Sequence, residues 1–299
     1  MTQWLLSLEG TGAGRQVAMG LALMAAFLHA LFGALQKGRH DPWLSRAAID
    51  AVYATAAAPF ALFVVPWPEP HMWPVFAGAL VIHTFYKLAQ AMTYQRGAYG
   101  VVYPVVRGTG PFFAVIGAGL VFGERFSPGQ WAGVAVLMTG IFGLALYNLR
   151  TVGAERETLV PALLWAVVTG AFVALYTTYD AYGIRATADP FTFLAWFFLI
   201  DGVFMPVYMW RRWRRLPASE AVPLLKRGVI GALVAYLSFG AILLATRIGP
   251  VGEAAVLRET SVVFAALIAR AVLGERVGPR RLGLMAMIAA GAVMMKLAG

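Results

Sequence analysis

Hydrophobic residues occur along this chain in long runs, separated by short links that contain polar residues, glycine or proline. A run of about 20 apolar residues is the length that an α-helix needs to cross a hydrocarbon core roughly 30 Å thick. Short alternating strands, the pattern of a membrane barrel, are not found. The pattern therefore predicts an all-α integral membrane protein with ten transmembrane helices, at about 17–36, 46–65, 72–94, 98–121, 129–148, 160–183, 191–210, 227–247, 250–272 and 282–297.

Composition supports the membrane assignment. Apolar residues make up 60% of the chain and charged residues 13%, whereas soluble domains carry about a quarter charged residues. The absence of cysteine excludes disulfides and thiolate metal sites. The first 15 residues lack a basic region followed by an apolar core, so we expect no cleavable signal peptide.

The chain contains an internal repeat. At an offset of 151 residues, 96–140 matches 247–291 at 14 of 45 positions. The predicted organisation is an N-terminal tail (1–16), a first five-helix repeat (17–149), a polar linker (150–158) and a second five-helix repeat (159–299). Because five is odd, the second repeat enters the membrane in the opposite sense. Inverted repeats of this kind are typical of secondary transporters, which bind their substrates near the midplane between the halves.

Basic residues are distributed unevenly between the two sides. Links after odd-numbered spans hold fifteen Lys and Arg residues, against five on the other side, and the cluster Arg211-Arg212-Trp213-Arg214-Arg215 contributes much of the difference. The positive-inside rule then places both termini outside a cell membrane. This topology explains the net charge of +10 without a nucleic-acid partner.

An arginine lies deep in the fourth span and another in the ninth. Arg107 and Arg258 occupy equivalent positions of the repeat, each roughly 12–13 Å from a membrane surface. Arg107 shares a helix face with Tyr103, and Glu259 adjoins Arg258. Ionisable groups at that depth are costly and usually functional. We expect the two guanidinium groups to bind an anion; the alternative is that protein carboxylates neutralise them.

Polar side chains also share one face of the third span, where His83, Lys87 and Gln90 predict a cavity wall or interhelical hydrogen bonds. In the sixth span, Tyr176 and Asp180 are spaced i, i+4. This carboxylate either binds a substrate ammonium group or neutralises Arg107 or Lys87.

Other polar residues receive weaker interpretations. We expect Pro104, Gly108, Gly110 and Pro111 to kink or break the fourth span. Packing is favoured for the face of the first span that carries His29, Gly33 and Gln36. Asp50 and Glu253 lie near span ends and are expected to reach water, and Asp201 is a second-tier site candidate. Glu124 and Glu275 are interpreted as architectural residues of surface turns.

Both repeats contain an apolar span that ends in Gly-Glu-Arg, at Leu120–Arg125 and again at Ala271–Arg276. With the five-plus-five pattern, these motifs resemble the EamA-type members of the drug/metabolite transporter superfamily over nearly the whole chain. The resemblance implies a ten-helix basket with a central cavity and no ATPase, which moves small metabolites or drugs, often outward and with proton exchange. The segment Tyr103–Pro111 is similar to that of a subgroup linked to phosphonate utilisation. Gly133 and Gly283 fall one residue out of register, and many family members are drawn with their termini inside.

We therefore predict a secondary transporter of the cell (inner) membrane, not an enzyme, for a small anionic or zwitterionic metabolite such as an amino acid, an organic acid or a phosphonate. A flippase for a lipid-linked sugar or phosphate and an intramembrane head-group transferase are the alternatives. The predicted partners are this substrate and the bilayer, with no cofactor apart from a coupled proton carried by Glu259, Asp180 or His83, and the unit is a monomer or a dimer. The predicted substrate-binding residues are Arg107, Arg258, Tyr103, Lys87, His83, Tyr176, Asp180, Glu259 and Gln90.

Overall fold

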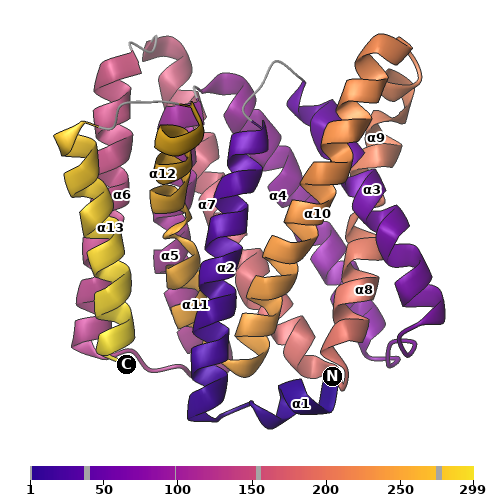
Figure 1. Cartoon of the computed structure of the whole chain (residues 1–299), viewed down its shortest axis with the longest axis horizontal. Coiled ribbons are helices and arrows are strands. Elements are labelled where there is room, and N and C mark those ends of the chain that lie inside the picture. Colours follow the sequence, from indigo (N-terminus) through magenta and orange to yellow (C-terminus); the bar gives the residue numbers. More distant parts are fainter. Residues whose placement is uncertain (1, 37–40, 98, 153–155, 274–277) are drawn as a thin grey trace.

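The computed structural model describes residues 2–36, 41–97, 99–152, 156–273 and 278–299. Within these ranges the chain is a bundle of α-helices, without a β-strand (Figure 1). The helices are α1 (Thr2–Ser7), α2 (Gly12–Gln36), α3 (Pro42–Phe63), α4 (Met72–Arg96), α5 (Tyr99–Phe122), α6 (Pro128–Val152), α7 (Arg156–Ala186), α8 (Pro190–Asp201), α9 (Phe204–Trp213), α10 (Ala218–Ile248), α11 (Val251–Arg258), α12 (Ser261–Leu273) and α13 (Pro279–Leu297).

Each predicted apolar run coincides with one helix or with two helices on either side of a break. The seventh run contains α8 and α9, and the ninth contains α11 and α12. Within the described residues, seven helical segments are long and apolar enough to cross a membrane. The all-helical, multi-span character that the sequence predicts is confirmed.

Local sequence explains where several helices begin. Asp41 precedes Pro42, and its carboxylate accepts hydrogen bonds from the free N–H groups of Trp43 and Leu44 at the start of α3. The same Asp-Pro pair starts α8, where Asp189 accepts from Phe191 N. An acidic N-cap followed by proline satisfies the unpaired donors of a first turn and suits their partial positive charge.

Both termini lie at one end of the bundle, which we call the terminal face; the other end is the opposite face (Figure 1). Helix α1 lies across the terminal face, and α2 runs from there to the opposite face. The basic cluster Arg211–Arg215, at the end of α9, lies at the opposite face.

Helix packing follows a regular scheme. The most extensive pairs are α6 with α13, α2 with α10, α5 with α7 and α4 with α7. At the α6–α13 crossing, Gly140 and Gly291 bring the two backbones together. A Cβ atom on Gly140 would lie 2.9 Å from Leu284 O, and one on Gly291 would lie 2.5 Å from Leu137 N. Close backbone approach at small residues is a common way for membrane helices to associate.

Of the predicted kink or break in the fourth span, the break is wrong, because α5 runs from Tyr99 to Phe122 as one helix that contains Pro104 and Pro111. The break occurs instead in the equivalent span of the second repeat, at Glu259–Thr260. There the N–H groups of Glu259 and Thr260 donate to the carbonyls of Val256 and Leu257, three residues back. This tighter winding ends α11.

Candidate functional site

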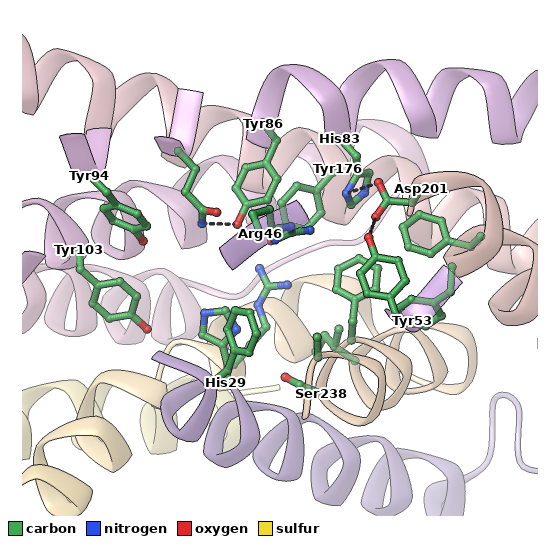
Figure 2. Close-up of a pocket in the computed structure, with 18 residues that line it drawn as sticks. His29, Arg46, Tyr53, His83, Tyr86, Tyr94, Tyr103, Tyr176, Asp201 and Ser238 are labelled. Atoms are coloured by element: carbon green, nitrogen blue, oxygen red, sulfur yellow. Dashed lines mark hydrogen bonds and ion pairs between the residues drawn. The ribbon is translucent and has the colours of Figure 1, made fainter. Parts of the chain in front are cut away.

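A cavity of about 90 Å³ lies between the helices (Figure 2). This volume accommodates several water molecules or a small ligand. The residues around it are His29, Phe32, Arg46, Tyr53, His83, Tyr86, Gln90, Tyr94, Tyr103, Tyr176, Phe197, Phe198, Asp201, Ala235, Ser238, Phe239, Ile242 and Arg258. The wall is therefore mostly aromatic, with polar groups at a few points.

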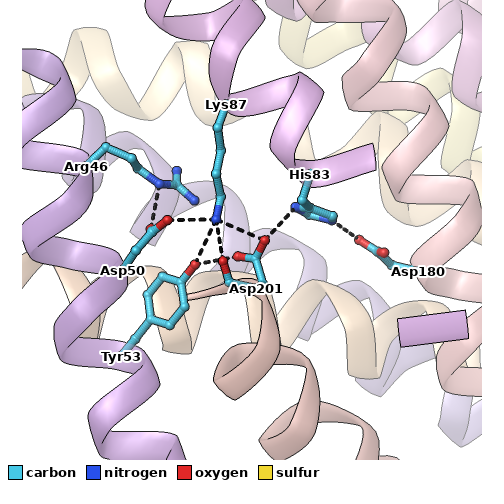
Figure 3. A network of polar contacts seen from close by, with 7 residues as sticks. All are labelled: Arg46, Asp50, Tyr53, His83, Lys87, Asp180 and Asp201. Carbon is cyan, nitrogen blue, oxygen red and sulfur yellow. Dashed lines mark hydrogen bonds and ion pairs between the residues drawn. The ribbon is translucent and has the colours of Figure 1, made fainter. Parts of the chain in front are cut away.

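The first polar group beside the cavity is a chain of ion pairs that joins α3, α4, α7 and α8 (Figure 3). We call it the aspartate network; it consists of Arg46, Asp50, Tyr53, His83, Lys87, Asp180 and Asp201. Lys87 is its centre: Nζ lies 2.7 Å from Asp50 Oδ2 and 2.9 Å from Asp201 Oδ1, and donates to Asp201 O at 2.8 Å. Arg46 Nε donates to the other oxygen of Asp50 at 2.7 Å, and the Tyr53 hydroxyl donates to Asp201 Oδ2.

His83 extends this network across the cavity wall. Its Nε2 shares a hydrogen bond of 2.8 Å with Asp180 Oδ2, and its Nδ1 lies 3.8 Å from Asp201 Oδ1. Asp180 is fully buried, and its Oδ1 has no hydrogen-bond partner within the described structure. With a neutral imidazole, the network holds two cations and three carboxylates, a surplus of one negative charge.

The second polar group, which we call the arginine cluster, consists of Arg107, Thr177, Arg258, Glu259 and Ser261. Arg107 Nε lies 2.8 Å from Glu259 Oε2, and Arg258 Nε lies 3.7 Å from Glu259 Oε1. Neither pair has the alignment of a hydrogen bond, because the N–H groups are not directed at the oxygens. The hydrogen bonds go instead from Arg107 to the Ser261 hydroxyl and from Arg258 to the Thr177 hydroxyl, both at 3.1 Å.

The arginine cluster has the opposite charge balance. Two guanidinium groups share one carboxylate, which leaves a surplus of one positive charge. Arg258 is the member that faces the cavity. A positive surplus in a mostly aromatic wall favours a ligand with an anionic group.

Tyr176 lies between the two polar groups. The Arg258 guanidinium lies 5.9 Å from the centre of its ring, and the imidazole of His83 packs on the same ring with centroids 4.7 Å apart. The cation and the aromatic face attract each other at this distance. The two charged groups are therefore neighbours along a single wall of the cavity.

The structure brings the nine predicted site residues into one region but in two layers. Five line the cavity: Arg258, Tyr103, His83, Tyr176 and Gln90. Gln90 donates to the Tyr86 hydroxyl at 2.6 Å. The other four, Arg107, Lys87, Asp180 and Glu259, lie behind the wall in the ion pairs described above.

Several residues of this region were missed or assigned another role from sequence. Asp50, expected to reach water, is fully buried between two cations, since α3 begins at Pro42 and places it about 12 Å from the end of the helix. Arg46, counted as a surface charge, faces the cavity, as does His29, for which packing was favoured. Asp201, a second-tier candidate from sequence, lies at the end of α8 and pairs with Lys87 at the centre of the aspartate network. In the sequence, the i, i+4 spacing of Arg46 and Asp50 was the one pattern that could have predicted this ion pair.

Across the terminal face, the two halves of the chain are joined by polar contacts. Glu124, next to Gly123 with its left-handed φ of 68°, accepts hydrogen bonds from Val251 N (2.6 Å) and Gly252 N (3.0 Å) and so caps α11. Within the second half, Arg185 donates to the carbonyls of Thr246 and Gly249, each at 2.8 Å, and its guanidinium lies 4.6 Å from the centre of the Phe122 ring in the first half. The architectural role expected for Glu124 is therefore that of an N-terminal cap of α11. Glu275 lies outside the described residues.

Two further contacts cross the terminal face. Arg15 pairs with Glu253 at 3.0 Å, so that Glu253, expected to reach water, is buried. Glu69 accepts from Ala188 N at 2.9 Å and from the Thr187 hydroxyl at 3.2 Å. Partial burial acts to raise the pKa of Glu69, but these hydrogen bonds outweigh it and hold the pKa below its ordinary value. Glu124, Glu253 and Glu69 therefore each join the two halves at the terminal face.

Metal-binding chemistry has no support in the described part of the chain, where no group of three or more His, Asp or Glu side chains is placed to hold a metal ion. The polar groups beside the cavity are instead paired with one another, as acids with bases.

Comparison with known proteins covers both halves of the chain. The sequence profile of the EamA-like transporter family matches residues 16–146 and again 160–297. The uncharacterized protein y4nH of Sinorhizobium fredii (strain NBRC 101917 / NGR234) is 33% identical over 77 residues, which are 26% of this chain and 66% of that protein. A crystal structure of another protein superposes with a TM-score of 0.72 over 96% of this chain and 99% of its own, at 18% identity, a likeness of fold alone. The two profile matches confirm the resemblance and the duplication: the chain is a multi-pass membrane protein that belongs to the EamA-like transporter family.

Proposed function

We propose that this protein is a secondary transporter that binds a small anionic or zwitterionic metabolite in the central cavity, with its carboxylate or phosphonate group at Arg258. Members of the EamA-like family are transporters rather than enzymes. The observation that carries the proposal is the position of Arg258: its guanidinium faces the cavity from a cluster with more positive than negative charge.

The aromatic walls support a compact organic ligand rather than an inorganic ion. Tyr86, Tyr176, Phe197 and Phe239 are in mutual ring contact around His83, with centroid distances of 4.7 to 6.2 Å. Apolar walls with a few oriented polar groups are typical of sites for small organic molecules. A substrate's carbon skeleton would pack on these rings while its anionic group binds Arg258.

The proposed architecture is ten membrane spans in two inverted five-helix repeats. The packing supports it, because the most extensive helix pairs between the two repeats occur as equivalents of one another. Helix α2 packs on α10 as α7 packs on α4, and α5 packs on α7 as α12 packs on α2. These pairs exchange when each span is replaced by the one five positions later, as a two-fold relation requires.

We propose that transport proceeds by alternating access, in which one repeat tilts against the other. We infer that the contacts of Glu124, Glu69 and Glu253 close the terminal face in the present state. We also infer that the cavity opens toward the opposite face, because Arg46, near the start of α3, lines it. The concentration of basic residues at the opposite face assigns it to the cytoplasm, and the proposed location is the cell (inner) membrane. The present state is then the cytoplasm-facing one.

Ligand-dependent thermal stability of the purified protein tests this function. We would measure the melting temperature with amino acids, organic acids, alkylphosphonates and quaternary amines, because a ligand stabilises the state that binds it. The proposal expects anionic or zwitterionic compounds to raise the melting temperature of the wild type and not of Arg258→Gln. Counterflow of the best compound into proteoliposomes would then follow. Stabilisation by quaternary amines alone, or an equal response of Arg258→Gln, would overturn the proposal.

A further inference from the structure

We propose that His83 and Asp180 form a proton-binding site whose occupancy is linked to the anion at Arg258, so that an anion in the cavity favours proton uptake and a bound proton favours the anion. The inference rests on the proposed function for its meaning in transport. Its physical basis is the charge balance of the buried side chains, which holds whether or not a substrate is known.

The charges around the cavity cancel. In the described part of the chain, the aspartate network and the arginine cluster contain four cations and four carboxylates. The cations are Arg46, Lys87, Arg107 and Arg258, and the carboxylates are Asp50, Asp180, Asp201 and Glu259. With neutral histidines the sum is zero.

A bound anion disturbs this balance. Its negative charge neutralises the positive surplus of the arginine cluster, and the negative surplus of the aspartate network is then left without compensation. An unbalanced charge in a low-dielectric interior is costly, since water cannot screen it. Uptake of one proton by the aspartate network restores neutrality.

His83 is the group placed to take that proton. If Nε2–H donates to Asp180, the lone pair of Nδ1 faces Asp201 Oδ1 at 3.8 Å, an acceptor directed at an acceptor. A proton on Nδ1 converts this contact into an attractive one with Asp201 Oδ1, an oxygen that accepts no hydrogen bond in the described structure and has Lys87 Nζ at 2.9 Å as its other charged neighbour. Both His83 and Asp201 line the cavity, so the proton has a route to the substrate space.

The other acidic and basic groups are less suited. Asp50 is held between Arg46 and Lys87, and Glu259 lies between two guanidinium groups. His29 faces the cavity from α2 without a carboxylate neighbour among the described residues. The titratable and charged groups around His83 are Arg46, Asp50 and Tyr53 from α3, Tyr86 and Lys87 from α4, Tyr176 and Asp180 from α7, Asp201 from α8, Arg258 from α11 and His29 from α2.

The two sites are close enough to influence each other. Tyr176 contacts both, at 4.7 Å from the His83 ring and 5.9 Å from the Arg258 guanidinium, so the imidazole and the guanidinium are no more than about 11 Å apart. Across that distance, a unit charge in a protein interior changes a protonation equilibrium by about tenfold. Linkage is reciprocal, so the proton strengthens anion binding by the same factor.

Two variants imitate the addition and the removal of a negative charge without any ligand. Arg258→Gln lowers the sum of charges by one, as a bound anion does, and Glu259→Gln raises it by one. Nitrogen-15 NMR of the histidines in lipid nanodiscs measures the ratio of protonated to neutral His83, assigned with His83→Gln. The comparison is made at the pH where wild-type His83 is half protonated, and the infrared band of a protonated carboxyl, assigned with Asp180→Asn, reports a proton on Asp180.

We expect the ratio of protonated to neutral His83 to rise about tenfold in Arg258→Gln and to fall about tenfold in Glu259→Gln. Ser261→Ala, which removes a neutral partner of Arg107, is the matched control and leaves the ratio unchanged. A general perturbation of the fold would not give opposite signs in neighbouring residues. Equal ratios in all proteins, or a shift in one direction for both charge variants, overturns the inference. Because the titration needs no substrate, its failure is separate from a failure of the ligand screen.

Discussion

The aspartate network and the arginine cluster lie on the same cavity wall but differ in charge balance and in support. The aspartate network joins four helices, and Lys87 contacts two carboxylates and a backbone carbonyl. The arginine cluster is held by one ion pair of 2.8 Å, by a second of 3.7 Å and by hydroxyl groups, next to the break that ends α11. In the aspartate network the charged side chains pair with one another and carboxylates are in excess. In the arginine cluster, Arg258 remains available to a ligand in the cavity. The difference indicates separate roles: one group holds charge inside the protein, and the other receives charge from a ligand.

Removal of the cation at the centre of the aspartate network gives the largest expected effect. Lys87→Met leaves Asp50 and Asp201 without their shared partner, and loss of one member of a buried ion pair costs about 3–5 kcal/mol. We expect the melting temperature in detergent to fall by about 5–15 °C. The matched control is Lys87→Met with Asp50→Asn, which restores the original charge balance and recovers part of the loss. Equal melting temperatures for Lys87→Met and the wild type would show that the ion pairs of Lys87 do not stabilise the fold.

In the arginine cluster, the same kind of change acts on binding. Arg258→Gln removes the donor that faces the cavity, and hydrogen bonds to charged groups are worth about 1.5–3 kcal/mol. We expect the affinity for the best anion of the thermal screen to fall roughly 10- to 150-fold, with a melting temperature near that of the wild type in the absence of ligand. Arg258→Lys keeps the charge and loses the planar fork, so its affinity lies in between. Affinity that does not depend on residue 258 would remove the distinction between the two groups.

Arg258 is the last residue of α11, and the hydrogen bonds that hold the first turn of this helix provide the next test. Glu124→Gln weakens the charge-assisted cap on Val251 and Gly252, a change of about 1–2 kcal/mol. Because the natural chain has no cysteine, a single Ala181→Cys or Ala57→Cys reports local opening by its rate of thiol labelling. We expect Glu124→Gln to accelerate labelling several-fold at position 181, which packs near Val251, and not at position 57 in α3. Exposed Glu220→Gln is the control, and equal acceleration at both positions contradicts a local effect.

The smallest expected effect concerns the ring between the two groups. Tyr176→Leu removes the aromatic face beside Arg258 and His83, and a cation–π contact contributes about 0.5–2 kcal/mol. We expect anion affinity to fall by a factor of about 2–30, whereas Tyr176→Phe keeps the ring and most of the affinity. A larger loss in the phenylalanine variant would instead assign the role to the hydroxyl group.

The sequence predicts the helices well and their interactions only in part. Run length locates the apolar segments, since a membrane requires about 20 residues for each, and the repeat identifies Arg107 and Arg258 as equivalent. Equivalence in sequence does not imply equal environment: Arg258 faces the cavity, while Arg107 lies behind it with Glu259.

Long-range pairing is what the sequence does not specify. Asp50 and Asp201 are 151 residues apart, and the structure joins both to Lys87. The start of α3 at Pro42 also decides whether Asp50 is buried, and a shift of a few residues in a predicted boundary was enough to place it in water. The helix break at Glu259–Thr260 contains no proline or glycine, so the sequence does not predict it.

The most direct measurement of the whole account is the number of protons taken up when the best anion of the thermal screen binds to the purified protein in weakly buffered detergent solution. At a pH midway between the protonation midpoints of the free and the anion-bound protein, where a tenfold linkage has its largest effect, the account predicts uptake of about half a proton per monovalent anion in the wild type, with both binding and uptake strongly reduced in Arg258→Gln. Tight anion binding without proton uptake, or unchanged binding in Arg258→Gln, would contradict the claim that an anion at Arg258 and a proton at His83–Asp180 balance each other.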